Sequence, residues 1–295
     1  GKLPAKLNTV IQPLMESVRI ENDAYYQKWC AKALADLIFM CKDRSPSPNA
    51  KLVKNLCARA TLHVPTAATK EAMFSKFGVL ERGAILALEE TVTRFGTSSS
   101  QSLPVLVTQM SSQLCHLNSA TSDYDRGQLL QNLVLTSHME SVLPLVFSTF
   151  SSLLTSIARC ILVLDDFVVY AASSCFIRVS GICLDDALEV VFEVLMPKLE
   201  EVQSGKGHEH VRGLLEFLGM LTEQHAMRLL SVIPHVLVRI IPLLSSQDAA
   251  IRSPAVETFS KLFPLFSLDQ GEDQSDGAKL PGCLEGHVSK QSVDE

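Results

Sequence analysis

The chain has 295 residues, of which 47% are hydrophobic and 20% are charged, and its formal net charge is -6. This length and apolar content can build the core of one or two domains, and the acidic balance argues against a broadly basic nucleic-acid-binding surface. Aromatic residues make up only 6% of a chain rich in Leu, Val and Ala, which favours packed helices over a β-sandwich.

The N-terminal residues predict a helical hairpin. Apolar side chains recur at helical spacing over Leu7–Arg19, which contains Pro13, and again over Tyr25–Cys41. The polar turn Glu21–Asp23 separates these helices, and an acidic residue before a helix can accept its unpaired N–H groups. Trp29, the only tryptophan, lies in the middle of the second helix, so we expect it in the core rather than on a ligand-binding surface.

The middle of the chain is less regular than its two ends. Helical spacing predicts helices at Lys76–Phe95 and Leu103–Leu117. Polar residues, Gly and Pro interrupt that spacing, and they predict loops at Pro65–Lys70, Thr97–Ser102 and Asn118–Gln128.

The C-terminal half repeats one pattern, in which a proline-containing helix, a short polar turn and a second helix follow one another. The second helices carry Val168, Val211 and Ile251 at comparable positions, 43 and 40 residues apart, and HEAT and armadillo units repeat at about 40–47 residues. We expect the prolines to bend the first helices. The predicted first helices are Ser141–Leu154, Leu184–Val202 and Leu229–Leu244, and the second helices are Val168–Ile182, Val211–Glu223 and Ala249–Phe263.

This repeat predicts an all-α, HEAT/armadillo-like solenoid of stacked antiparallel helical hairpins over residues 1–267. One hairpin cannot bury its apolar face alone, so stacking supplies the core. Residues 268–295 are polar and rich in Gly, Asp, Ser and Gln, and we expect a disordered tail there. Small residues in the second helices would let neighbouring helices approach closely: Ala31, Gly83, Ala172, Gly213 and Ala255.

The sequence offers no specific catalytic constellation. Gly205-Lys206-Gly207 lacks the spacing of a phosphate-binding loop, so a flexible loop is expected. His208 and His210 could share a metal ion, but a third ligand at a suggestive spacing is missing, and solvent-exposed histidines are the better interpretation. The acidic pairs Asp165–Asp166 and Asp185–Asp186 precede predicted helices, where capping explains them better than acid–base catalysis. We therefore predict no enzyme, and neither a catalytic, a metal-binding nor a cofactor-binding residue.

The thiols and the local basic residues also favour structural roles. None of the cysteines forms a C-x-x-C pair, so buried reduced thiols in an intracellular protein are favoured over disulfides or a zinc site. Lys51, Lys54 and Arg59 lie along one predicted helix and are interpreted as a solvated face rather than a phosphate track. The cysteines are Cys30, Cys41, Cys57, Cys115, Cys160, Cys175, Cys183 and Cys283.

A membrane span and a signal peptide are not expected. The start GKLPAKLNTV lacks an apolar segment, and it begins with Gly rather than Met, which is compatible with a fragment of a longer protein. Charged residues interrupt the most apolar stretches, Leu153–Leu164, Phe167–Leu184 and Leu229–Leu244, whereas a span needs about 20 apolar residues.

Two stretches carry a more specific signal. The segment Lys6–Cys57 resembles the TATA-binding-protein-associated factors of the B-TFIID complex, in which a KLNPxIxPLMExI helix precedes DRxPxPNxKIIKNLC. The stretch Glu81–Gly96, ERGAILALEETVTRFG, resembles the RRGAEFAL…FG helix of the same family, and weaker similarity continues to residue 266. The matching residues of the first stretch are Lys6-Leu7-Asn8, Pro13-Leu14-Met15-Glu16, Asp43-Arg44, Pro46, Pro48-Asn49 and Lys54-Asn55-Leu56-Cys57.

The resemblance implies a nuclear transcription regulator. Members of this family combine a long HEAT array with a Swi/Snf-type ATPase, which uses ATP and magnesium to strip TATA-binding protein from promoter DNA. This chain would correspond to the C-terminal part of the HEAT region, without the ATPase, and it would meet promoter DNA only indirectly. The region after Cys57 is shorter than in the family, and no functional residue of the family can be placed on a numbered position here. The alternative is a HEAT adaptor for transport or assembly with no link to TATA-binding protein.

Overall fold

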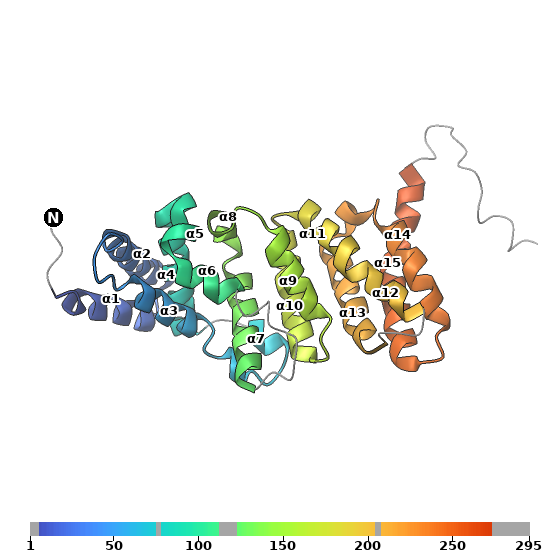
Figure 1. The fold of residues 1–295 in the computed structure, drawn as a ribbon, viewed down its shortest axis with the longest axis horizontal. Coiled ribbons are helices and arrows are strands. Elements are labelled where there is room, and N and C mark those ends of the chain that lie inside the picture. Colours follow the sequence, from blue (N-terminus) through green and yellow to red (C-terminus); the bar gives the residue numbers. More distant parts are fainter. Residues whose placement is uncertain (1–5, 75–77, 112–122, 204–207, 273–295) are drawn as a thin grey trace, which may run out of the picture.

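The computed structural model describes residues 6–74, 78–111, 123–203 and 208–272. Within these ranges every regular element is a helix, and no strand is present. The helices stack side by side into an elongated array that follows the chain from its N-terminal to its C-terminal end (Figure 1). The prediction of an all-α solenoid of helical hairpins is confirmed.

The longer helices form two rows along the array. Consecutive helices of the second row pack against each other, α2 on α4, α7 on α10, α10 on α13 and α13 on α15, and so do several of the first row. The first row contains α1 (Asn8–Ile20), α3 (Asn49–Ala60), α6 (Pro104–Ser111), α9 (Ser151–Ile161), α11 (Leu184–Val190), α12 (Met196–Gln203) and α14 (Ile233–Ile240). The second row contains α2 (Ala24–Met40), α4 (Val79–Phe95), α7 (Asp123–His138), α10 (Asp166–Ser180), α13 (His208–His225) and α15 (Ala249–Glu272).

Short helical turns connect the rows. A π-helical turn, η6 (Val191–Leu195), joins α11 to α12. The other short elements are η1 (Val64–Thr66), η2 (Glu71–Phe74), η3 (Gly96–Ser98), α5 (Ser99–Ser102), η5 (Glu140–Val142), α8 (Leu143–Val146), η7 (Ala226–Leu229) and η8 (Ile241–Ser245).

One hydrophobic core runs the length of the array, from Leu7 to Leu262. Val168, Val211 and Ile251, the positions that set the predicted repeat, are all buried, with 3%, 1% and 2% of their surface exposed. Each hairpin therefore buries the same stripe of its second helix against its neighbours, as stacked repeats require.

The small residues lie where helices meet closely. Ala31, Ala172 and Ala255 are fully buried. A Cβ atom on Gly83 would overlap the carbonyl oxygen of Val18, at the end of α1. A Cβ atom on Gly213 would lie 2.9 Å from Val169 Cγ1, on α10. The predicted close approaches are confirmed, and at Gly83 only a hydrogen atom fits.

Most prolines begin a helix instead of bending one. Pro144, Pro234 and Pro242 occupy the first turns of α8, α14 and η8, where a missing N–H costs no helical hydrogen bond. The single helix predicted at Ser141–Leu154 is therefore wrong, because the chain leaves the helix at Phe147–Phe150 and resumes it in α9. Pro13 does lie inside α1, as predicted.

The middle of the chain is more helical than predicted. The loop predicted at Asn118–Gln128 is wrong from Asp123 onward, where α7 begins, and its residues 118–122 lie outside the described ranges. The loop predicted at Thr97–Ser102 is also wrong: η3 and α5 cover it, and Ser99 Oγ donates to the carbonyls of Val92 (3.0 Å) and Gly96 (2.6 Å). The helices predicted at Lys76–Phe95 and Leu103–Leu117 correspond to α4 and α6, with residues 75–77 and 112–122 outside the described ranges, and η1 covers the start of the predicted loop Pro65–Lys70.

The predicted boundary between residues 267 and 268 falls inside α15, which continues to Glu272. Residues 273–295, most of the predicted tail, lie outside the described ranges, so the tail stays a prediction. Among the helices that the structure describes, none is long and apolar enough to cross a membrane.

Candidate protein-binding surface

The motif around Arg82 builds a buried hydrogen-bond network. Gln27, fully buried in α2, donates through Nε2 to the carbonyls of Val18 (2.9 Å) and Val79 (2.7 Å). Arg82 Nε donates to Gln27 Oε1 (2.6 Å), and Arg82 Nη2 donates to the carbonyl of Asn22 (2.8 Å). The network ties the end of α1 and the α1–α2 turn to the start of α4. These residues therefore hold the first two hairpins together.

Three further residues of the first motif are also buried. Asn49 Nδ2, at the start of α3, donates to the carbonyl of Ile38, at the end of α2 (2.9 Å). Leu56 and Cys57 are buried in α3, and burial raises the pKa of the Cys57 thiol to about 12. Packing thus explains these three residues, whereas other residues of the motif, such as Lys54 and Asn55, are exposed.

The first acidic pair caps a helix, as predicted. Asp165 Oδ1 accepts from the N–H groups of Phe167 (2.9 Å) and Val168 (3.1 Å), and its carboxylate pairs with Arg126 of α7. Burial raises the pKa of Asp165, but the hydrogen bonds from Arg126 and from the two backbone N–H groups outweigh it, so the pKa is lowered overall. The cap and the ion pair together fix α10 beside α7.

The second acidic pair does not cap by side-chain hydrogen bonds. Asp185 and Asp186 lie in the first turn of α11, whose N-cap position is Cys183 with no side-chain cap. The prediction of capping is wrong for this pair, although two carboxylates in a first turn still face the positive end of the helix dipole.

The other candidates from the sequence are described only in part. Residues 204–207, which include Gly205-Lys206-Gly207, lie outside the described ranges, and His208 begins α13. Within the part of the chain that the structure describes, no group of three His, Cys, Asp or Glu side chains could hold a metal ion. Lys51 and Lys54 are exposed along α3 and Arg59 is half-buried, in agreement with a solvated face. Six free cysteines are described, and Cys41, Cys57, Cys160 and Cys175 among them are buried.

Trp29 is not in the core, so that prediction is wrong. Its side chain is 56% exposed on α2, beside Tyr25, whose ring centroid lies 6.2 Å away in an edge-to-face arrangement. Lys32 Nζ lies 5.6 Å from the centre of the Trp29 ring, within the range of a cation–π contact. Tyr25 and Trp29 therefore form an exposed aromatic ridge at the N-terminal end of the array.

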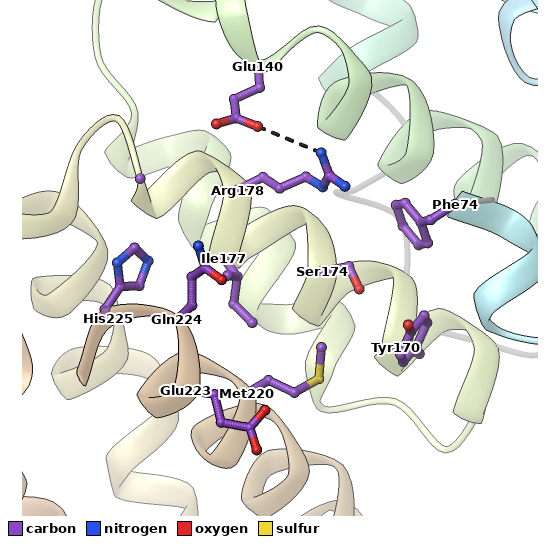
Figure 2. A pocket seen from close by; sticks show the side chains of 11 residues that line it. Phe74, Glu140, Tyr170, Ser174, Ile177, Arg178, Met220, Glu223, Gln224 and His225 are labelled. Carbon is purple, nitrogen blue, oxygen red and sulfur yellow. Dashed lines mark ion pairs between the residues drawn. The ribbon is translucent and has the colours of Figure 1, made fainter. Parts of the chain in front are cut away.

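The second-row helices α10 and α13 border a groove with a volume of about 540 Å³ (Figure 2). Two short elements complete its walls, since Phe74 comes from η2 and Glu140 from η5. Sequence reasoning missed this groove because its lining comes from four separate segments. The lining residues are Phe74, Glu140, Tyr170, Ser174, Ile177, Arg178, Gly181, Met220, Glu223, Gln224 and His225.

Aromatic, aliphatic, polar and charged side chains line the groove together. Phe74 and Tyr170 meet edge to face, with ring centroids 6.1 Å apart. Arg178 Nη1 lies 3.8 Å from Glu140 Oε2 across one rim (Figure 2), a separation longer than a hydrogen bond. On the opposite rim Glu223 pairs with Lys261 of α15 at 3.0 Å.

The histidines at the groove are neutral structural groups. Nε2 of His225 and the hydroxyl of Ser180 share a hydrogen bond of 2.8 Å, and burial lowers the pKa of His225. His138, which contacts Phe74 from below the groove, has its pKa lowered to about 3 by burial and by the charges of Arg178 and His63. Both rings are therefore uncharged at neutral pH.

Comparison with known proteins adds a family context. Residues 1–80 match a family model described as a domain of unknown function, DUF3535. The TATA-binding protein-associated factor BTAF1 of Arabidopsis thaliana is 25% identical over an alignment that covers 100% of this chain and 17% of the plant protein. The TATA-binding protein-associated factor mot1 of Schizosaccharomyces pombe is 26% identical, with 92% of this chain and 17% of the yeast protein covered.

The chain is similar to proteins named TATA-binding protein-associated factors over nearly its whole length. The suspected resemblance is thereby confirmed. The human TATA-binding protein-associated factor 172 matches 57 residues at 44% identity, which is 19% of this chain and 3% of the human protein. The chain spans about a sixth of the length of the plant and fission yeast relatives. An engineered protein of known structure covers 86% of the chain at 14% identity, but its TM-score of 0.32 is too low to establish a shared fold.

Proposed function

We propose that this chain is a scaffold segment of a transcription regulator that binds TATA-binding protein and helps an ATP-driven motor remove it from promoter DNA. The observation that carries the proposal is the alignment with proteins named TATA-binding protein-associated factors over 91–100% of the chain. ATP hydrolysis and promoter contact belong, in this proposal, to parts of the regulator outside the chain, and the regulator acts in the nucleus.

The array suits a scaffold. Its core is continuous from the first hairpin to the last, and buried polar networks such as that of Gln27 and Arg82 fix adjacent hairpins in one geometry. A rod of this kind sets the distance and the angle between whatever is attached to its two ends. Its grooves and ridges supply additional contact surface along one side.

The first test is a pull-down of TATA-binding protein with the immobilised chain, with and without a promoter DNA duplex. Capture of TATA-binding protein supports direct binding by this chain. Loss of capture on adding DNA would show that DNA and this chain compete for TATA-binding protein. A Trp29→Ala variant and a Met220→Ala variant then locate the contact, because one changes the aromatic ridge and the other the groove.

The scaffold role is tested separately in the fission yeast relative. Its matching segment is replaced by this chain, and the rate at which the hybrid protein releases TATA-binding protein from DNA in the presence of ATP is measured. Release at the native rate supports a scaffold that transmits geometry. A hybrid that still hydrolyses ATP but releases nothing, together with a failed pull-down, would favour the alternative, an adaptor for an unrelated partner.

A further inference from the structure

We propose that the exposed face of α3 binds an acidic segment of a partner protein. The inference rests on the part of the proposed function that makes this chain a holder of protein partners. It does not depend on whether that partner is TATA-binding protein. In the free chain this face is solvated, and an acidic segment would replace part of that water.

The acidic residues of the chain avoid the region around α3. The chain has 32 Asp and Glu against 26 Lys and Arg, yet none of its acidic residues lies between Asp43 and Glu71. The same stretch contains Lys51, Lys54 and Arg59, all of them within α3. α3 is therefore a basic helix without a carboxylate of its own, in a chain that is acidic overall.

The two lysines of α3 lie on the same exposed side of the helix. Lys51 and Lys54 are three residues apart, which makes them neighbours on a helix surface, and both are exposed. Asn55 and Ala58 continue this exposed side. Arg59, half-buried, extends the positive charge towards the end of the helix, about 12 Å from Lys51 at 1.5 Å per residue.

The cations of α3 have no internal counter-ion among the residues that the structure describes. Cations elsewhere in the array commonly pair with a carboxylate, as Arg126 does with Asp165. Lys51, Lys54 and Arg59 form no such ion pair within the described ranges. Their charge is therefore balanced by solvent ions in the free chain and is available to a partner.

The helices α4 and α6, which pack against α3, do not supply a carboxylate to its lysines. α6 contains no acidic residue. On α4, Glu81 Oε1 lies 2.7 Å from His63 Nδ1, Glu90 lies 3.8 Å from Lys28, and Glu89 accepts from a serine hydroxyl of η5 at 2.8 Å. Positive charge on α3 therefore stands without opposing charge from these two neighbours, which favours an anionic partner.

Three observations favour an acidic protein segment over a nucleic acid. Duplex-binding proteins typically contact about 6–10 phosphates, whereas α3 offers three cations. No aromatic residue on α3 could stack on a base, and the formal net charge of -6 repels a long polyanion. Leu62, two residues beyond the end of α3, is 60% exposed and offers apolar contact, which a peptide can use and a phosphate backbone cannot.

The test is a selection of random 12-residue peptides displayed on phage against the whole immobilised chain. Phage that bind the double variant Lys51→Gln/Lys54→Gln are removed first, so that the remaining binders depend on the two lysines. We expect the remaining peptides to be enriched in Asp and Glu, although the chain is acidic overall. In fluorescence-anisotropy titrations of these peptides, the double variant should bind about 5-fold more weakly than the parent, because surface ion pairs each contribute modestly. Raising the salt concentration should weaken binding to the parent as well.

The matched control is Lys198→Gln/Arg212→Gln, which removes the same amount of charge. Both residues form ion pairs within their own helices, α12 and α13, away from α3 along the array (Figure 1). This control should change affinity less than two-fold. A second variant, Lys51→Arg/Lys54→Arg, keeps both charges on α3 and should bind the selected peptides within two-fold of the parent.

Remaining peptides that are neutral or basic would overturn the inference. So would an affinity that falls equally in the control and in Lys51→Gln/Lys54→Gln, because attraction would then come from net charge alone. A short DNA duplex that binds more tightly than the peptides, and that needs the same lysines, would make the face a nucleic-acid surface and also refute it. Capture of TATA-binding protein in the pull-down together with any of these results would leave the proposed function standing and remove only the assignment of α3.

Discussion

The contact at Gly83 supports a quantitative prediction. In Gly83→Ala the new Cβ atom would overlap the carbonyl oxygen of Val18 and lie 2.5 Å from Gln27 Nε2. Relieving the overlap must push α1 away from α4 or break the hydrogen bond from Gln27 to Val18. Overpacking costs about 1–3 kcal/mol, and an unsatisfied buried polar group costs about 1–3 kcal/mol. Alanine recovers about 1 kcal/mol of helix propensity relative to glycine. When both costs apply, we therefore expect a net loss of stability of about 1–5 kcal/mol.

Gly219→Ala is the matched control for this prediction. Gly219 also lies inside a helix, α13, but a Cβ atom there would meet the flexible end of Lys261, at 3.5 Å, and Thr258 Oγ1, at 3.9 Å, both at ordinary van der Waals distance. Helix propensity should then dominate and leave the chain unchanged or more stable by up to about 1 kcal/mol. Urea unfolding followed by circular dichroism measures both variants. A Gly83→Ala protein as stable as the parent, or a Gly219→Ala protein that loses as much, would refute the reasoning.

Three further predictions concern other parts of the array. Gly213→Leu should wedge α13 away from α10 and cost about 1–3 kcal/mol, and an unchanged melting temperature would contradict the placement of Gly213 at a helix contact. Arg126→Leu should destabilise the chain at neutral pH, because the pKa of Asp165 is lowered in the folded state. The stability that the ion pair contributes is fully present above the ordinary Asp pKa of 3.8 and is lost as the pH falls through the lowered pKa of Asp165. The difference in melting temperature between the parent and Arg126→Leu should therefore shrink below pH 3.8. A difference that does not change with pH would argue against the ion pair. Trp29→Ala should change the free energy of unfolding by less than about 0.5 kcal/mol, since the side chain is largely exposed, and a loss above about 2 kcal/mol would place it in the core.

The fold was predictable because its signal is repeated. Val168, Val211 and Ile251 recur at the spacing of a helical repeat, and all three prove to be buried. Asp165 was predictable as a cap because capping depends only on the next two or three residues. Local order in the chain is thus well encoded in local sequence.

Features that depend on neighbours distant in sequence were not predictable. Trp29 lies on a helix with apolar residues on more than one face, so helical spacing alone could not tell which face is buried. A proline in the sequence can mark either the start of a helix or a bend inside one. At Pro144 and Pro234 only the packing of α8 and α14 shows that each proline lies at a helix start. The groove joins Phe74, Glu140 and the helices α10 and α13, and no spacing within one segment could reveal it.

The network of Gln27 and Arg82 has a mechanical consequence. It cross-links the α1–α2 turn to α4, so pulling the first hairpin away from the second must break several buried hydrogen bonds at once. Near the other end α14 and η8 are short and each has a proline in its first turn, so fewer continuous helical turns resist extension there. Under a load applied along the rod, for example in an optical trap, the last repeat should yield at lower force than the first two. A force applied at the C-terminal side would then extend the last repeat first. The first two hairpins, at the N-terminal side, would keep their geometry.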